Sequence, residues 1–383
     1  MQNTIEELKQ LFGEARASSE FDFVLTMLNY QGMASEISPT LHEWFDAIEF
    51  YKKLYAEHSD KEKARMALLL YSTFFENSDF YNIIGSLCRI KLGFKGSSYL
   101  FWKTKKYERL LGIGEKQDYL IELLDDCGKT GIISFFEENH HKEIRNTFFH
   151  AAYSIESDDY HLHDSDSIVI RNVGHYSFSL NDFFYPLVDN VIQFFGCFKK
   201  LYHDSWTSYT EEFDVQGNFL EPVTATILGS GQGLRGFRID DGPSFFGQTH
   251  ASGIWYDENS QLWAGHNIRF SHTDVETIEI REQLTRFENK PNIKRSDYEF
   301  NNLIDMVRER NRQDELARAI LLLLKFGDAR FNAMEAETNQ FKKASYPKMI
   351  IPFYEKAIEI NKSQFDLKEI IAKNEILKAA IPQ

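Results

Sequence analysis

Cysteines, prolines and basic residues are all in short supply in this 383-residue sequence. It holds 3 Cys and 8 Pro, and 43 Lys and Arg stand against 58 Asp and Glu, which gives a formal charge of −15 at pH 7. The cysteines, Cys88, Cys127 and Cys197, form no C-x-x-C pair and leave an odd number for disulfide pairing, so we expect a reducing, cytoplasmic location. The acidic charge repels polyanions at long range, so any contact with RNA must be local.

Long apolar runs are absent as well. No segment reaches about 18 consecutive apolar residues, and the first residues mix acids, bases and apolar side chains where a signal peptide would have an apolar run. We therefore expect no membrane partner. The 43% of hydrophobic and 26% of charged residues are typical of a soluble globular protein, and the length predicts two or three domains.

Helical periodicity dominates the first 205 residues. The segment LHEWFDAIEFYKKLYAEH carries its apolar residues along one stripe, and Ser59 and Asp60 then end that helix and begin another. Short β-rich runs, SIVIRNV and GHYSFSL, predict a hairpin before the apolar helix of NDFFYPLVDNVIQFFGCFKKLYHD. The other predicted helices lie near residues 60–77, 79–92, 97–111, 115–126 and 130–155.

Glycine becomes frequent after about residue 206. It separates short runs such as TATILG, LRGFRI, ASGIWY and TIEI, which predicts an antiparallel β-rich module. Beyond Pro291 a strong apolar stripe indicates helices again. We therefore predict an α+β fold with an N-terminal all-α bundle, a small β-hairpin, a β-rich module and C-terminal helices. The predicted parts are residues 1–39 (N-terminal helical segment), 40–205 (helical bundle), 206–290 (β-rich module) and 291–383 (C-terminal helical region).

One motif contains candidate catalytic residues. Within a predicted helix from Glu137 to Ile155, the sequence KEIRNTFFHAAYSI places Arg145 before the polar Asn146 and, after four intervening residues, His150. This pattern resembles the HEPN superfamily, whose helical bundles carry an Arg, four to six residues of which the first is polar, and a His in a late helix. The resemblance covers residues 40–204 and identifies Arg145, Asn146 and His150 as the candidate catalytic residues.

These residue types suit the cleavage of RNA. The nucleophile is the 2′-hydroxyl of the RNA itself, so an imidazole that moves a proton and a guanidinium that grips phosphate oxygens supply what the reaction needs. On a helix, Asn146 and His150 are four residues apart and face the same way. Arg145 and His150 are five residues apart, about 140° around the axis, so they do not share one face.

The resemblance has further implications for function. HEPN ribonucleases form composite sites across a two-fold axis, need no metal or other cofactor and leave a 2′,3′-cyclic phosphate. It therefore implies a homodimeric, metal-independent endoribonuclease, a toxin or antiviral-defence effector with an antitoxin or trigger protein as a partner. The alternative is a non-catalytic HEPN module that binds RNA or a partner protein. In a third possibility, residues 206–383 carry the function of the protein. Without any catalytic role, Arg145 would be a snorkelling cation and His150 a hydrogen-bonded core residue.

A basic and aromatic segment is the candidate RNA-docking surface. Between residues 89 and 109, seven basic residues stand against the single acid Glu108, with aromatic residues interleaved. Bases stack on aromatic rings and phosphates pair with cations, although a solvated helix face with core aromatics explains the pattern equally well. The candidate RNA-binding residues are Lys103, Lys105, Lys106, Tyr107 and Arg109.

Two other patterns favour ordinary structure. His161 and His163, with Asp164 and Asp166 close by, would be a conceivable metal site, but the acidic context indicates a polar loop. The run from Gly229 to Gly233 lacks the G-K-S/T of a phosphate loop and predicts a β-turn. We therefore predict no metal site.

Overall fold

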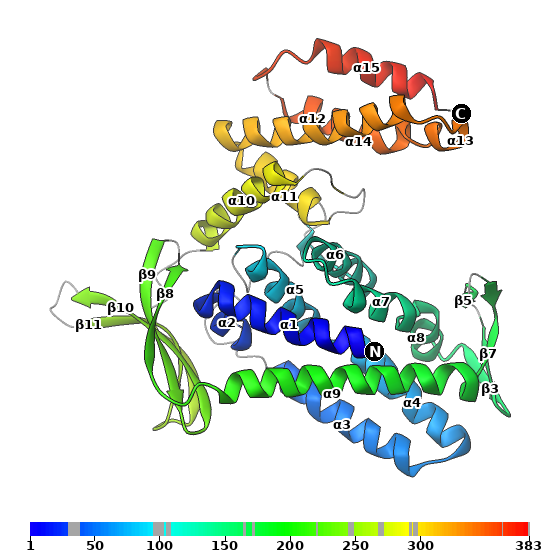
Figure 1. The fold of residues 1–383 in the computed structure, drawn as a ribbon, viewed down its shortest axis with the longest axis vertical. Coiled ribbons are helices and arrows are strands. Elements are labelled where there is room, and N and C mark those ends of the chain that lie inside the picture. The colour runs from blue at the N-terminus through cyan, green and yellow to red at the C-terminus, as the bar shows by residue number, and fades with distance from the viewer. Residues whose placement is uncertain are drawn as a thin grey trace. The chain divides into compact units, whose positions relative to one another are not determined.

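The protein has a mixed α+β fold. The computed structural model describes residues 1–29, 39–94, 103–104, 109–163, 166–170, 173–219, 221–243, 249–266, 272–290, 293, 298–361 and 363–381. The chain forms two compact units, one of residues 1–99 and 112–270 and the other of residues 100–111 and 271–383 (Figure 1). The division into four domains made from the sequence stays a prediction, because compactness alone does not show which segments fold independently.

Helices build most of the first unit. Their packing is dominated by aromatic side chains: Trp44 lies among phenylalanine rings, and Phe135 stacks on Phe194 with ring centroids 4.1 Å apart. The helices are α1 (Gln2–Ser18), α2 (Glu20–Met27), α3 (Pro39–Glu57), α4 (Asp60–Glu76), α5 (Ser78–Lys91), α6 (Ile113–Asp126), α7 (Thr130–Asn139), α8 (Lys142–Phe149) and α9 (Tyr185–Thr207). A short π-helical turn, Leu180–Phe184, leads into α9. The helices predicted at 60–77, 79–92 and 115–126 are confirmed.

The long helix predicted over residues 130–155 is wrong. Tyr71 explains the first break, because its buried hydroxyl donates to the carbonyl of Asn139 at 2.9 Å and accepts from the N–H of His141 at 2.7 Å, which satisfies both helix ends. Ala151 explains the second, because it adopts a positive φ of 52° after α8 and the chain then turns into a strand. Arg145 and Asn146 of the predicted catalytic motif therefore lie in a helix of eight residues, and His150 is its C-cap.

Small antiparallel sheets follow α8. Strands β3 (Tyr153–Glu156), β4 (Asp159–Leu162) and β7 (Ser177–Ser179) form one sheet, and β5 (Ile168–Ile170) pairs with β6 (Val173–His175). A hairpin does form in the predicted region, but β6 begins in the first of the two β-rich runs, and β7 in the second run pairs with β4 instead. Tyr160 of β4 stacks between Tyr153 and Phe178, with centroids 5.2 and 5.0 Å away. Its hydroxyl lies 2.9 Å from Thr147 Oγ1 and so ties this sheet to α8.

The β-rich module is a five-stranded antiparallel sheet in which sequential strands are neighbours. Its strands are β8 (Phe213–Phe219), β9 (Glu221–Ser230), β10 (Gly233–Pro243), β11 (Thr249–Asp257) and β12 (Leu262–His266). Gly233 pairs with Ser230, so the run from Gly229 is the predicted turn. The run TIEI is not a strand, because it lies inside helix α10 (His272–Asn289), and Ile280 of this run is buried in a helical core.

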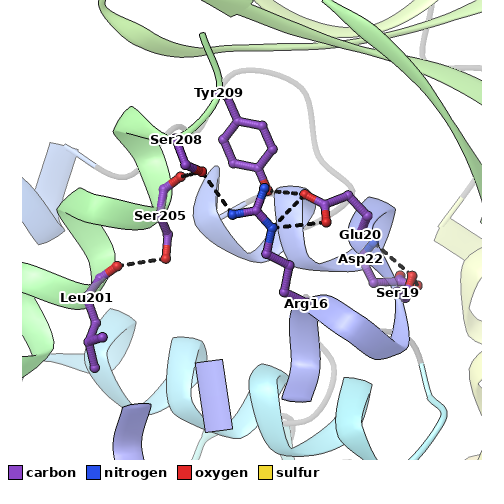
Figure 2. Close-up of polar contacts among 8 residues, drawn as sticks. All are labelled: Arg16, Ser19, Glu20, Asp22, Leu201, Ser205, Ser208 and Tyr209. Carbon is purple, nitrogen blue, oxygen red and sulfur yellow. Dashed lines mark hydrogen bonds and ion pairs between the residues drawn. The ribbon is translucent and has the colours of Figure 1, made fainter. Parts of the chain in front are cut away.

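A polar cluster joins the start of the bundle to the sheet (Figure 2). Arg16 donates from Nε to both oxygens of Glu20 at 3.0 Å and from Nη1 to Ser208 Oγ at 2.9 Å, and its guanidinium lies 4.8 Å from the Tyr209 ring centroid. The Tyr209 hydroxyl donates to Glu20 at 2.7 Å. Beside the cluster, Phe21 of α2 packs edge-on against a sheet phenylalanine. These contacts fix the sheet to the bundle.

The second unit is a helical assembly that begins with α10. It continues with α11 (Tyr298–Arg310), α12 (Gln313–Ala336), α13 (Gln340–Lys343), α14 (Pro347–Ile360) and α15 (Lys368–Ala379). Phe300, Leu323 and Phe326 are among the residues of its core. Strands β1 (Lys103–Thr104) and β2 (Arg109–Leu110) pair within this unit, so the helix predicted at 97–111 is wrong. Gly93, at a φ of 83°, ends α5 before that segment. Among the described residues, no helix combines the length and apolar character that a membrane span requires.

Candidate functional site

Helix α8 and its C-cap hold the three predicted catalytic residues. Its inner face is held in place by Ile144 and Thr147, which are buried, with Thr147 bonded to Tyr160. Arg145 and Asn146 lie in the helix and are partly buried, whereas His150 caps its C-terminal end and is exposed. The imidazole is therefore accessible to solvent.

Asn146 and His150 line the same cleft. This cleft has a volume of about 690 Å³ and is open to solvent. The four-residue spacing therefore has the effect expected from the sequence, because residues four apart share one helix face. The other lining residues are Lys142, Glu143, Thr147, Ala152 and Asp166.

Arg145 does not line this cleft. Its Nε forms an ion pair with Glu76, the last residue of α4, and its Nη1 donates to Asn146 Oδ1 at 2.9 Å. The guanidinium carbon also lies 5.4 Å from the centroid of the Phe149 ring. The five-residue spacing thus separates Arg145 from His150, but Asn146 connects the guanidinium to the cleft.

The protein interior behind Arg145 is weakly solvated. Burial, together with smaller electrostatic effects of His141 and Arg145, lowers the pKa of His140 to about 4, so the His140 ring is neutral at pH 7. Burial also raises the pKa of Tyr81, with the nearby Glu76 carboxylate adding to that shift. The side chains of Arg145 and Glu76 are 32% and 33% exposed, so their ion pair lies at the edge of this interior.

The candidate RNA-docking residues lie in the other compact unit. Lys103 is in β1 and Arg109 is in β2, where Lys103 pairs with Leu110 and Arg109 with Thr104 along the backbone. Lys105, Lys106 and Tyr107 lie outside the described residues.

His163, one of the histidines after α8, contacts a neighbouring strand. Nε2 of His163 lies 3.0 Å from Ser154 Oγ, across the β3–β4 pairing. Asp164 lies outside the described residues, and among the described ones no three His, Cys, Asp or Glu side chains gather as a metal site requires. The alternative of a metal held by His161 and His163 gains no third ligand here.

Several residues of the site were not identified from the sequence. Glu76 is 69 positions before Arg145, so no local spacing relates the two. Lys142, by contrast, precedes Asn146 and His150 by one and two steps of four residues, a helical signal that is present in the sequence. Glu143 and Asp166 add two carboxylates to the cleft.

Comparisons with protein-family models, curated proteins and solved structures found no match to this chain. The resemblance to HEPN domains therefore rests on the motif from Arg145 to His150 and on the helices around it.

Proposed function

We propose that this chain is a metal-independent endoribonuclease of HEPN type, which acts in the cytoplasm as a toxin or antiviral-defence effector. The observation that carries the proposal is the cleft at the end of α8, where the exposed His150 and the amide of Asn146 lie together and Arg145 is bonded to that amide. Proton transfer and stabilisation of phosphate charge are the two functions that cleavage by the RNA's own 2′-hydroxyl requires.

Each residue has a distinct role in the proposed reaction. His150 takes a proton from the 2′-hydroxyl or gives one to the departing 5′-oxygen, for which an imidazole is suited near neutral pH. Arg145 and Asn146 donate hydrogen bonds to the phosphate as negative charge builds on it. The 2′-oxygen bonds to phosphorus as the bond to the 5′-oxygen breaks, which leaves a 2′,3′-cyclic phosphate.

A homodimer completes this proposed site. In-line cleavage uses both an acid and a base, and one α8 supplies a single exposed histidine to the cleft. A two-fold axis beside α8 would bring a second His150 and a second Arg145 to the same phosphate. We propose that the working enzyme is this dimer, with RNA as its substrate.

Segment 103–109 is the proposed RNA-docking element. Lys103, Lys105, Lys106 and Arg109 provide charge for the phosphates, and Tyr107 provides a ring for stacking. A separate compact unit that carries this segment also suits control by a trigger protein or an antitoxin. The non-catalytic module remains the competing proposal.

Replacing single side chains tests the proposed activity. We expect His150→Ala to lower RNA cleavage by about 10²- to 10⁴-fold, because it removes the proton-transfer group. His161→Ala is the matched control, since it removes an imidazole eleven residues later that does not line the cleft. A single 2′-deoxy nucleotide at the cleavage position should block the reaction. If wild-type dimer leaves every RNA intact, the interaction module is the better description.

A further inference from the structure

Glu76, Arg145 and Asn146 form a chain of polar contacts that ends in the cleft. Glu76 accepts from Arg145 Nε, and Asn146 accepts from Arg145 Nη1 at 2.9 Å. Nη2 has no hydrogen-bond partner within the described part of the chain. The side chains of Glu76 and Arg145 are 33% and 32% exposed, so neither is sealed from solvent.

The same contacts orient the amide of Asn146. Its oxygen accepts from Arg145, so the NH₂ group, on the opposite side of the carbonyl carbon in the same plane, is turned away from that guanidinium. Asn146 lines the cleft together with His150. An amide N–H in this position is a donor for a phosphate oxygen.

Glu76 is the fixed end of this chain of contacts. It ends α4, a helix whose buried residues include Tyr71 and Phe75, so its backbone is well anchored. Lys116 is a second cation near Glu76, but its amino group donates to Ser78 Oγ at 2.7 Å. Without Glu76, Arg145 would keep Asn146 and the Phe149 ring, two contacts that move with α8 itself.

We propose that Glu76 is a positioning residue of the ribonuclease site, which anchors Arg145 so that its guanidinium and the Asn146 amide present their donors to the RNA phosphate beside His150. This inference rests on the proposed function. A long guanidinium side chain has many rotamers, and one fixed ion pair removes much of that freedom before substrate arrives.

Substitutions of Glu76 test the proposal. We expect Glu76→Ala to lower kcat by about 10- to 100-fold with a smaller change in KM, because misplaced donors act mainly in the transition state. Glu76→Gln keeps an acceptor and should retain more activity than Glu76→Ala. The matched control is Glu62→Ala, which removes an exposed carboxylate from the same helix. All variants should keep the wild-type melting temperature within a few degrees.

A double variant distinguishes a positioning role of Glu76 from an effect of Glu76 on cleavage that is independent of Arg145. If Glu76 acts through Arg145, Glu76→Ala combined with Arg145→Ala should cleave no more slowly than Arg145→Ala alone. If the double variant instead lost activity by the product of the two single-variant factors, the proposal would be overturned. Cleavage by Glu76→Gln that is faster than by wild type would also overturn it, because the carboxylate would then hold Arg145 in a less active position.

An NMR measurement tests the anchor without relying on activity. The Nε–H resonance of Arg145, assigned by its loss in Arg145→Lys, should be visible in wild type, in Glu62→Ala and in His150→Ala. It should broaden or disappear in Glu76→Ala, where the acceptor is gone. An unchanged resonance in Glu76→Ala would overturn the inference. Failure of wild type to cleave RNA would instead overturn the proposed function, and the resonance would still report on the anchor.

Discussion

Arg145 and His150 leave the same short helix in different directions. Arg145 pairs with Glu76 and bonds to Asn146, whereas His150 is exposed in the cleft that Asn146 also lines. The asparagine between them in the motif is therefore the residue that joins the two parts of the site. This arrangement makes the composite dimer a specific, testable proposal.

Mixing chains tests the composite site. When wild-type chains are exchanged with an excess of His150→Ala chains, we expect cleavage to fall below that of the same amount of wild type alone. Each heterodimer has one exposed His150 where acid and base catalysis need two. The measurement is the initial rate of RNA cleavage after exchange, with His161→Ala chains as the control. Undiminished cleavage would argue for a site complete in one protomer.

Removing divalent metal ions tests the source of charge stabilisation. We expect cleavage to persist in excess chelator, because the nucleophile is the 2′-hydroxyl and the phosphate charge is met by Arg145. The measurement is the cleavage rate before and after chelation, with magnesium or zinc added back. Loss of activity that a metal restores would direct attention to His161 and His163.

Neutralising the docking segment should weaken the salt dependence of RNA binding. Replacing Lys103, Lys105 and Lys106 with alanine removes up to three phosphate contacts, which should reduce the slope of log K against log salt concentration by about 2 for single-stranded RNA. Binding titrations across salt concentrations of the inactive His150→Ala protein measure this slope. Alanine at the three basic positions 342, 343 and 348 provides a control with the same change in charge. An unchanged slope in the segment variant would show that these lysines are solvated surface residues that do not contact RNA.

His140 should make the protein less stable in acid. Its pKa is lowered to about 4 in the folded protein, so the unfolded chain binds a proton first as the pH falls. The free energy of unfolding is not affected by this titration above about pH 6.5, and it decreases by up to about 3 kcal/mol between pH 6.5 and 4. We expect His140→Phe to flatten the unfolding free energy over this range in urea titrations. Parallel profiles for the two proteins would contradict this assignment.

A pair of glycines tests the packing of the five-stranded sheet. Gly236 has a φ of 129°, and an added Cβ would lie 2.1 Å from the carbonyl oxygen of Ile254, so we expect Gly236→Ala to cost more than about 2 kcal/mol of stability. Gly231 has no heavy atom within 4 Å of an added Cβ, and Gly231→Ala should change stability by less than about 0.5 kcal/mol. Chemical unfolding of both variants measures the difference, and equal costs would contradict the register of β10 and β11.

Local patterns determined much of this molecule. The stripe of LHEWFDAIEFYKKLYAEH is helix α3, a hairpin of β5 and β6 forms in the region of the two β-rich runs, and the glycine-rich region holds an antiparallel sheet. The spacing of Asn146 and His150 also placed both residues on one face. These features depend on a few neighbouring residues, and periodicity, turn residues and helix geometry act at that range.

Only the tertiary structure decided where the motif helix ends and what holds its arginine. Tyr71 satisfies the chain break before α8 from 68 and 70 positions away, and Glu76 reaches Arg145 from another helix. Neither partner has a fixed spacing from the motif, because helix packing sets which side chains meet. A buried hydroxyl that pairs both free backbone groups makes a break in the helix stable, and such a contact exists only after the bundle has formed.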